Sequence, residues 1–146
     1  PYSYLFNTRA TNTGTGKISV YVPNNFQTAG LYEFVSNTTA SLFIPHNFGN
    51  LLFKPKNIFI RPAILLIQNI TYGSLNNAAA QKNIEFKVPE KGLFESGLQV
   101  KNLYRRSLLS IVYIGLGGWV FYRYGYYALP KAIDNWSFKW GFSISF

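Results

Sequence analysis

The chain has 146 residues, a net charge of +9 and no cysteine, so it suits a single domain and excludes disulfides and thiolate metal sites within itself. Charged residues make up only 13% and aromatic residues 18%, whereas charged residues form roughly 25% of ordinary soluble domains. No window offers the roughly 20 continuous apolar residues that a membrane-spanning helix needs, which leaves a membrane-facing or deeply buried sheet.

The N-terminal region predicts two short strands. It begins PYSYLFNTRA, with neither an initiator Met nor a signal-peptide pattern, so we expect a processed chain or a piece of a longer one. Tyr2–Thr11 and Lys17–Val22 alternate between apolar and polar residues, and the sequence NTGTGK between them predicts a turn.

Two long alternating segments follow, Leu31–Asn47 and Phe59–Leu75. Alternation predicts strands because successive strand side chains point to opposite faces of a sheet. The apolar face of the first segment opposes Glu33 and consists of Tyr32, Phe34, Ala40, Leu42 and Ile44. The apolar face of the second opposes Arg61, Asn69 and Thr71, is interrupted by Gln68, and consists of Ile60, Ile64, Leu66, Ile70 and Tyr72.

Three further strands complete the pattern: Leu93–Tyr104, Leu109–Tyr127 and Asn135–Phe146. The second of them has Gly115 and Gly117 on its polar face, where small residues would let a neighbouring wall or a lumen plug come close. The third alternates without a break, and its apolar positions are Trp136, Phe138, Trp140, Phe142, Ile144 and Phe146.

The connections between these strands suggest two sides. A tight turn is predicted around Arg105 and Arg106, whereas Asn76–Gly92 is a long polar loop. If the last residue lies at the periplasmic end of an outer-membrane barrel, the tight turn and Phe48–Asn57 are periplasmic. The long loop and Ala128–Asp134 are then outside, where barrels have their longer loops.

Strand length favours a membrane. The predicted strands run to about 12 to 19 residues, against the usual 5 or 6 of globular proteins, and about 9 to 11 are enough to cross a bilayer. Every charge inside them falls on a polar face. Since charges within a barrel are costly unless paired or hydrated, we predict a lumen charge network, which consists of Glu33, Arg61, Glu95, Lys101, Arg123 and Lys139. Glu33 and Glu95 could instead act as a carboxylate pair.

The sequence offers little catalytic chemistry. His46 is the only histidine, so no His-based metal site can form within the chain, and a turn or interface role is expected for it. No G-x-S-x-G elbow occurs, and GLGG at 115–118 lacks the Lys-Ser/Thr of a phosphate loop. Lys and Arg form no basic stripe. We therefore predict no enzyme, no cofactor, no metal and no nucleic-acid partner.

Four stretches together resemble the C-terminal part of a family of large outer-membrane barrels in Bacteroidetes that carry a carboxypeptidase-like regulatory domain. They are FQTAGLYEFVSNTTASLFIPHNFGNLLFKP, RPAILLIQNITYGSL, KGLFESGLQVKNL and FYRYGYYALPKAIDNWSFKWGFSISF. The family has an acidic-basic pair after FVS, where this chain has Asn37 and Thr38. More remotely, the last strands are similar to BamA-type barrels. The resemblance implies that the chain closes a longer barrel, and that its end carries a signal read by the barrel assembly machinery, formed by Trp140, Phe142, Ile144 and Phe146.

We therefore predict an all-β protein, an antiparallel transmembrane β-barrel of the outer-membrane type, with residues 1–146 as the C-terminal strands of a larger barrel. It would be a structural, transport or complex-forming subunit of the bacterial outer membrane. Its partners would be outer-membrane lipid and lipopolysaccharide, the assembly machinery and other outer-membrane proteins. Two alternatives stay open: a BamA-like assembly or secretion component, and a soluble β-sandwich surface module. Aromatic rings packed between two sheets would favour the sandwich.

Overall fold

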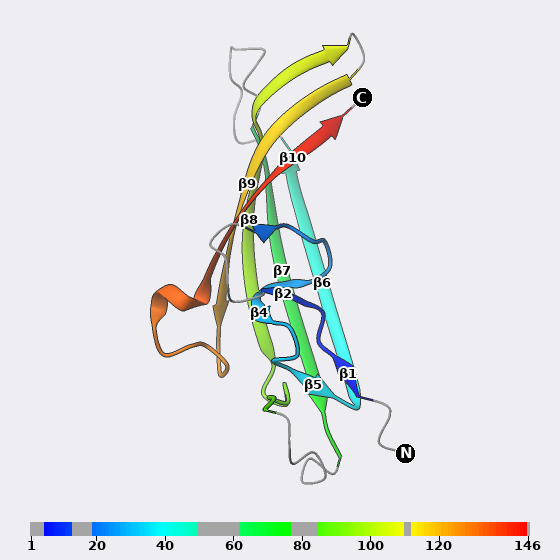
Figure 1. Ribbon diagram of the computed structural model, residues 1–146, viewed down its shortest axis with the longest axis vertical. Helices are drawn as coiled ribbons and strands as arrows, with labels where there is room; N and C mark the ends of the chain where they lie inside the picture. Colours follow the sequence, from blue (N-terminus) through cyan, green and yellow to red (C-terminus); the bar gives the residue numbers. More distant parts are fainter. Residues whose placement is uncertain (1–4, 13–18, 50–61, 77–84, 110–111, 146) are drawn as a thin grey trace.

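The computed structural model describes residues 5–12, 19–49, 62–76, 85–109 and 112–145, and within these ranges the protein is all-β (Figure 1). A short 3-10 turn, η2 (Ala132–Asn135), precedes the last strand. Within the same ranges, no helix has the length and apolar character needed to cross a membrane.

One six-stranded sheet dominates the fold. Its long strands are β6 (Thr38–Gly49), β7 (Ala63–Ser74), β8 (Leu93–Leu109), β9 (Val112–Tyr124) and β10 (Trp136–Ser145), each antiparallel to its neighbours in that order. The two-residue β3 (Ser19–Val20) pairs in parallel with β10. Among the described residues β6 pairs with β7 alone, so the sheet is not closed into a barrel.

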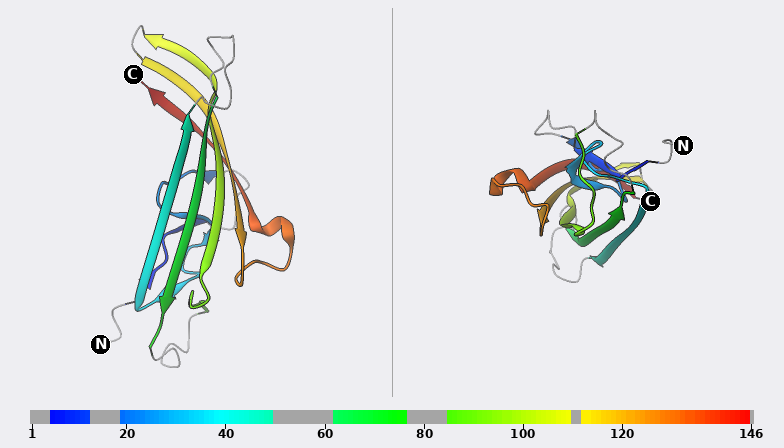
Figure 2. Two further views of the ribbon diagram at one scale, coloured as in Figure 1. Left: turned by 180° about the vertical axis from the view of Figure 1, so that it is seen from behind. Right: turned by 90° about the horizontal axis from the view of Figure 1, so that it is seen from below.

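The N-terminal residues lie inside the curve of this sheet. We call residues 5–12 and 19–36 the inner segment; besides β3 it contains β1 (Phe6–Asn7), β2 (Ala10–Asn12), β4 (Phe26–Gly30) and β5 (Val35–Ser36). β1 pairs with β5, and β2 pairs with β4. The long strands curve around these short ones, which Figure 2 shows from below.

The two faces of the sheet have opposite chemistry. Large apolar side chains are exposed on the outer face, and they are Leu42, Ile44, Leu66, Tyr72, Leu98, Leu116, Tyr124, Trp136, Phe138, Trp140 and Phe142. Polar side chains are buried on the inner face, and they are Asn69, Thr71, Glu95, Gln99, Arg123 and Lys139. The predicted alternation is therefore confirmed for β7 to β10. The exposed rings do not pack between two sheets.

Two apolar clusters fix the inner segment against the inner face. One joins Phe26 and Phe34 to Leu93 of β8. In the other, Tyr21 stacks on Trp119 and Phe121 of β9, with ring centroids 5.3 and 5.8 Å away. Burial of such rings stabilises the fold through the apolar area that it removes from water, so the inner segment is part of the core.

Gly97 makes room for the ring of Phe121, which gives a test of this packing. A Cβ at Gly97 would lie 2.3 Å from Cε1 of Phe121, far inside van der Waals contact. We expect Gly97→Ala to lower the free energy of unfolding by about 1 to 3 kcal/mol, the usual cost of overpacking, in denaturant titrations. Gly118→Ala is the control, because its Cβ would meet its nearest atom at 3.8 Å; equal losses for both variants would contradict the packing.

The prediction of one strand over Leu31–Asn47 is wrong in its first part. The chain turns after Gly30, with Tyr32 at a φ of 62°, and only β5 and β6 are extended. Phe34 is buried whereas Tyr32 is 68% exposed, so the two side chains do not share a face. Alternation over four residues cannot distinguish a strand from a turn whose ends are held by tertiary contacts.

The turn predicted at Arg105 and Arg106 is also wrong. Both residues lie in β8 and pair with Gly115 and Ile114 of β9. Their dibasic sequence carries no Gly, Pro or Asn to force a turn. β9, in turn, ends at Tyr124 rather than Tyr127, because Gly125 takes a φ of 85°.

Three further expectations are corrected or fall outside the described ranges. His46 lies within β6 opposite Leu66, so the turn expected for it is wrong, and its interface role stays a prediction. Among the described residues, only the short β1, β2 and β3 correspond to the predicted strands Tyr2–Thr11 and Lys17–Val22, and they are too short to cross a bilayer. Most of the NTGTGK turn, most of Phe48–Asn57, the start of Phe59–Leu75 and part of Asn76–Gly92 lie outside the described residues.

Candidate functional site

Glu95 joins the sheet to the inner segment from a fully buried position on β8. Its Oε2 accepts hydrogen bonds from the backbone amides of Gln27 and Thr28 at 2.8 and 2.7 Å, and from Oγ1 of Thr28 at 2.7 Å. Its Oε1 accepts one from Nδ2 of Asn69 at 2.8 Å. A buried carboxylate needs such charge-assisted partners, and three of the four come from β4.

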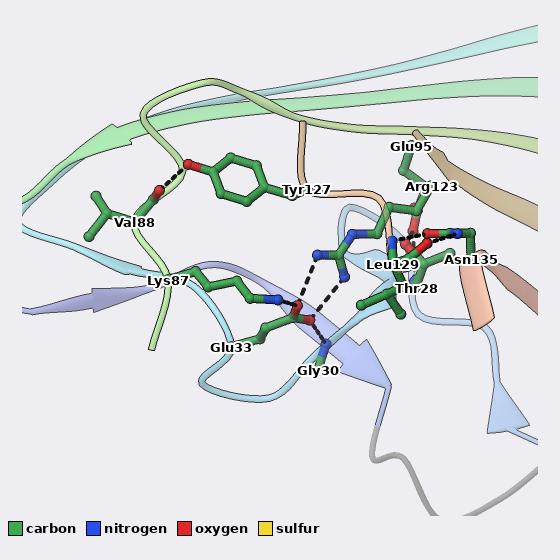
Figure 3. A network of polar contacts seen from close by, with 10 residues as sticks. All are labelled: Thr28, Gly30, Glu33, Lys87, Val88, Glu95, Arg123, Tyr127, Leu129 and Asn135. Atoms are coloured by element: carbon green, nitrogen blue, oxygen red, sulfur yellow. Dashed lines mark hydrogen bonds and ion pairs between the residues drawn. The ribbon is translucent and has the colours of Figure 1, made fainter. Parts of the chain in front are cut away.

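Arg123 forms a second connection. It lies directly opposite Glu95 in the register of β8 and β9, but its guanidinium binds Glu33 of the inner segment with two hydrogen bonds of 3.1 and 2.9 Å (Figure 3). The amide of Gly30 and Nζ of Lys87 also donate to Glu33, at 2.9 and 3.0 Å. Glu33 therefore holds together the turn after β4, β9 and the chain that leads into β8.

Aromatic rings cover one side of this ion pair. The guanidinium carbon of Arg123 lies 5.0 Å from the centroid of Phe34, within the range of a cation–π contact. Tyr127 meets Phe34 edge to face at 5.1 Å, and its hydroxyl donates to the carbonyl of Val88. These contacts exclude water from one side of the pair, which strengthens its electrostatic interaction.

The pKa of Glu33 makes the stability of its ion pair with Arg123 depend on pH. Burial by itself raises this pKa, but the hydrogen bonds from Arg123, Gly30 and Lys87 together with the charge of Arg123 lower it below its ordinary value of 4.5. A depressed folded-state pKa contributes stability above the unfolded pKa and loses it as the pH falls through the folded value. We therefore expect the difference in unfolding free energy between the wild type and Glu33→Gln to shrink below about pH 4.5, as measured by denaturant titration at several pH values. A constant difference would contradict this.

The predicted charge network divides into two groups. Glu33 and Arg123 pair directly, and Lys139, buried on β10, interacts electrostatically with Glu95. Lys101 is half-buried opposite Ala63, where β7 begins, and Arg61 lies outside the described residues. Glu33 and Glu95 bind different partners and thus do not act as a carboxylate pair.

Several residues of this site were not expected from the sequence. Thr28, Asn69 and Lys87 hold the two carboxylates, and Gln27 supplies a backbone amide. No sequence signal identifies a backbone donor. The alternation of the sequence puts Asn69 on the same face as the charged residues. This shared face is the one sequence signal that links Asn69 to the site.

The predicted terminal signal lies partly on the outer face. Trp140 and Phe142 of β10 are 57% and 80% exposed there. The side chain of Ile144 and all of Phe146 lie outside the described part of the chain.

A row of aromatic rings crosses the outer face near one end of the sheet. Tyr72 of β7 contacts Phe94 of β8, which stacks on Tyr124 of β9. Tyr122 lies beside Tyr124 and meets Trp136 of β10 at 4.6 Å. The row thus continues over four strands without interruption.

Gln68, which interrupts the apolar face of β7, has its polar atoms occupied. Its Oε1 accepts hydrogen bonds from Oγ of Ser96 at 2.6 Å and from the hydroxyl of Tyr124 at 3.2 Å. Its Nε2 donates to the carbonyl of Glu95 at 3.2 Å. The three side chains satisfy one another, which lowers the cost of placing an amide in apolar surroundings.

Comparison with family models, with curated proteins and with solved structures finds no match. Among the described residues there is also no group of three potential metal-ligating side chains. The features of the described residues that bear on function are the two faces of the sheet and the buried contacts of Glu33 and Glu95.

Proposed function

We propose that the chain is part of an outer-membrane β-barrel whose outer face contacts lipid and whose inner face lines the lumen. The observation that carries this is the distribution of side chains: Trp136, Phe138 and Trp140 are exposed, whereas Glu95, Arg123 and Lys139 are buried. A soluble sandwich would have the reverse arrangement. A contiguous apolar surface over four strands is what hydrocarbon chains cover in barrels of this type.

The height of the apolar surface supports the proposal. On β9 it runs from Tyr124 to Ile114, about 33 Å at about 3.3 Å per residue. With strands tilted by about 40°, this spans about 25 Å, the height of the apolar band of outer-membrane barrels. Within this band, the described outer-face residues of the five long strands include no Lys, Arg, Asp or Glu before Arg106. Arg106 pairs with Ile114 and therefore lies at the far end of the band.

The aromatic row gives an independent measure of strand tilt. Gln68, Ser96, Tyr122 and Trp136 are successive partners across β7 to β10, so Trp136 lies four residues along the strand from the level of Tyr72. Across three strand spacings, which measure about 14 Å, the row therefore shifts by about 13 Å along the strand direction. If it marks the membrane interface, as aromatic girdles do, the strands are tilted by about 43°, within the range of about 35 to 45° for such barrels.

The open edge of β6 supports a larger barrel. Every backbone polar group in lipid must be paired, so a spanning sheet has to close. Among the described residues β6 has no partner on its outer edge. We propose that further strands complete the wall, as the resemblance to the large Bacteroidetes barrels implies. The function is then that of a structural, transport or complex-forming subunit, with lipid, lipopolysaccharide and the assembly machinery as partners.

Extraction tests this proposal. The full-length protein should sediment with membranes, require detergent for solubility, and migrate faster in an unheated than in a boiled gel sample, because a closed barrel resists the detergent until it is heated. Recovery in the soluble fraction without detergent, with no change of migration on heating, would refute it.

A further inference from the structure

Glu95 and Arg123 both reach from the wall of the sheet to the same 19–36 part of the inner segment, although they lie directly opposite each other in the register. Glu95 binds Gln27 and Thr28, and Arg123 binds Glu33. Two opposite charges that are adjacent on a wall would ordinarily pair with one another. Here each is used to hold the inner segment.

The inner segment fills the space against which these charges point. Phe26, Ala29 and Phe34 are fully buried, and Tyr21 stacks on Trp119 and Phe121 across the inner face. Yet the segment itself has few hydrogen bonds of regular structure, because its strands contain five residues at most. Its position therefore depends on contacts with the wall.

We propose that residues 19–36 act as a plug that blocks the barrel lumen, and that the carboxylate of Glu95 is the latch that keeps the plug in place. This inference rests on the proposed barrel. Removal of the carboxylate frees three donors of β4 at once, because a single oxygen, Oε2, accepts all three. With only the Arg123–Glu33 pair and the apolar clusters left to hold it, the plug then leaves the inner face more often, while the wall, held by its own ladders, stays intact.

Two substitutions at this position separate the latch from mere packing. Glu95→Ala removes the acceptor. Glu95→Gln keeps one oxygen for the amides of Gln27 and Thr28, and its new NH2 group faces Asn69. The buried Oδ1 of Asn69 has no hydrogen-bond partner among the described residues and can accept from that group after the amide turns over. The Gln variant is therefore expected to retain the plug.

The first measurement is hydrogen exchange of the full-length protein in detergent micelles. In Glu95→Ala, the amides of residues 26–30 should exchange about 10- to 100-fold faster than in the wild type, the factor expected for loss of hydrogen bonds to a charged group. The amides of β7 to β10 should keep their protection. Leu98→Val, a change on the opposite, exposed face of β8, should alter neither set. Unchanged exchange at 26–30 in Glu95→Ala would overturn the latch.

The second measurement is ion conductance across planar lipid bilayers. The wild type and Glu95→Gln should stay closed for most of the recording, and Glu95→Ala should open. Thr28→Val, which removes one of the three donors at nearly constant volume, should open less often than Glu95→Ala. This milder variant keeps the test decisive if the Ala variant loses protection in its wall strands and hence fails to fold.

The outcomes distinguish the plug from the barrel. Faster exchange at 26–30 without any conductance, in a protein that still shows heat-modifiable migration, refutes the plug and leaves the barrel. An equally open wild type also refutes the plug. Loss of heat-modifiable migration in the wild type itself refutes the proposed barrel, and the plug falls with it.

Discussion

Replacing Glu33 with Gln is expected to lower the free energy of unfolding by about 2 to 3 kcal/mol, somewhat less than the about 3 to 5 kcal/mol lost when a fully buried ion pair is broken. The expected loss is smaller because the side chain of Glu33 is 21% exposed, although that of Arg123 is fully buried. The substitution leaves the guanidinium without its charged partner, in a place where Nε of Arg123 already has no hydrogen bond among the described residues. Denaturant titration in detergent micelles measures the loss.

Lys87→Gln is the matched control for this prediction. Lys87 contacts the same carboxylate at 3.0 Å, but its side chain is 47% exposed, so its loss should cost about 0 to 1 kcal/mol. The double variant Glu33→Gln/Arg123→Met should recover part of the stability, because it removes the stranded charge. Equal losses for Glu33→Gln and Lys87→Gln would show that the ion pair with Arg123 stabilises the fold no more than the one with Lys87.

Under the proposed membrane location, Arg in place of Leu98 is expected to cost about 2 to 4 kcal/mol, because a cation near the middle of a bilayer is expensive in a barrel wall. Leu98 lies on the outer face four residues along β8 from Phe94 of the aromatic row. This is about 13 Å along the strand, and hence about 10 Å from the interface with the tilt given above. Denaturant titration of the protein refolded into lipid vesicles measures the cost.

Tyr124→Arg provides the depth control. Tyr124 lies in the aromatic row itself, where the cost of Arg falls to about 0 to 1 kcal/mol. Leu98 and Tyr124 are about equally exposed, at 37% and 36%. In an aqueous environment depth would not matter, so Leu98→Arg would cost no more than Tyr124→Arg, which also loses the hydrogen bond of Tyr124 to Gln68. That result would remove the main support for lipid contact.

The long strands could be predicted because their pattern is local. Most of each of β7 to β10 alternates, as in Trp136, Phe138 and Trp140 against Ser137 and Lys139, and a shift by one residue would exchange the two faces. Over ten or more residues such a pattern has few competing explanations. The same reasoning failed over Leu31–Phe34, where only four residues alternate and a turn is held by distant contacts.

The site was predictable in its residue types but not in its pairing. Charges on polar faces must find partners, and this identifies Glu33, Arg123 and Glu95. Nothing local indicates that Arg123 would bind Glu33, 90 positions away, rather than Glu95 directly opposite on β8. Nor does the sequence show that Glu95 would be bound by main-chain amides, since every residue except proline has one.

The short parallel contact of β3 has a consequence for how the wall closes. β3 occupies the free edge of β10 at Lys139 and Trp140, and β10 is ten residues long. A strand arriving at that edge has to use the same main-chain groups, so it must displace β3. The two paired residues of β3 form few hydrogen bonds with β10, whereas a full antiparallel ladder would form many more, so the exchange is favourable. If the proposed barrel closes at this edge, Ser19 and Val20 must leave β10 first, while Tyr21 and the contacts of Glu95 still hold the rest of the inner segment.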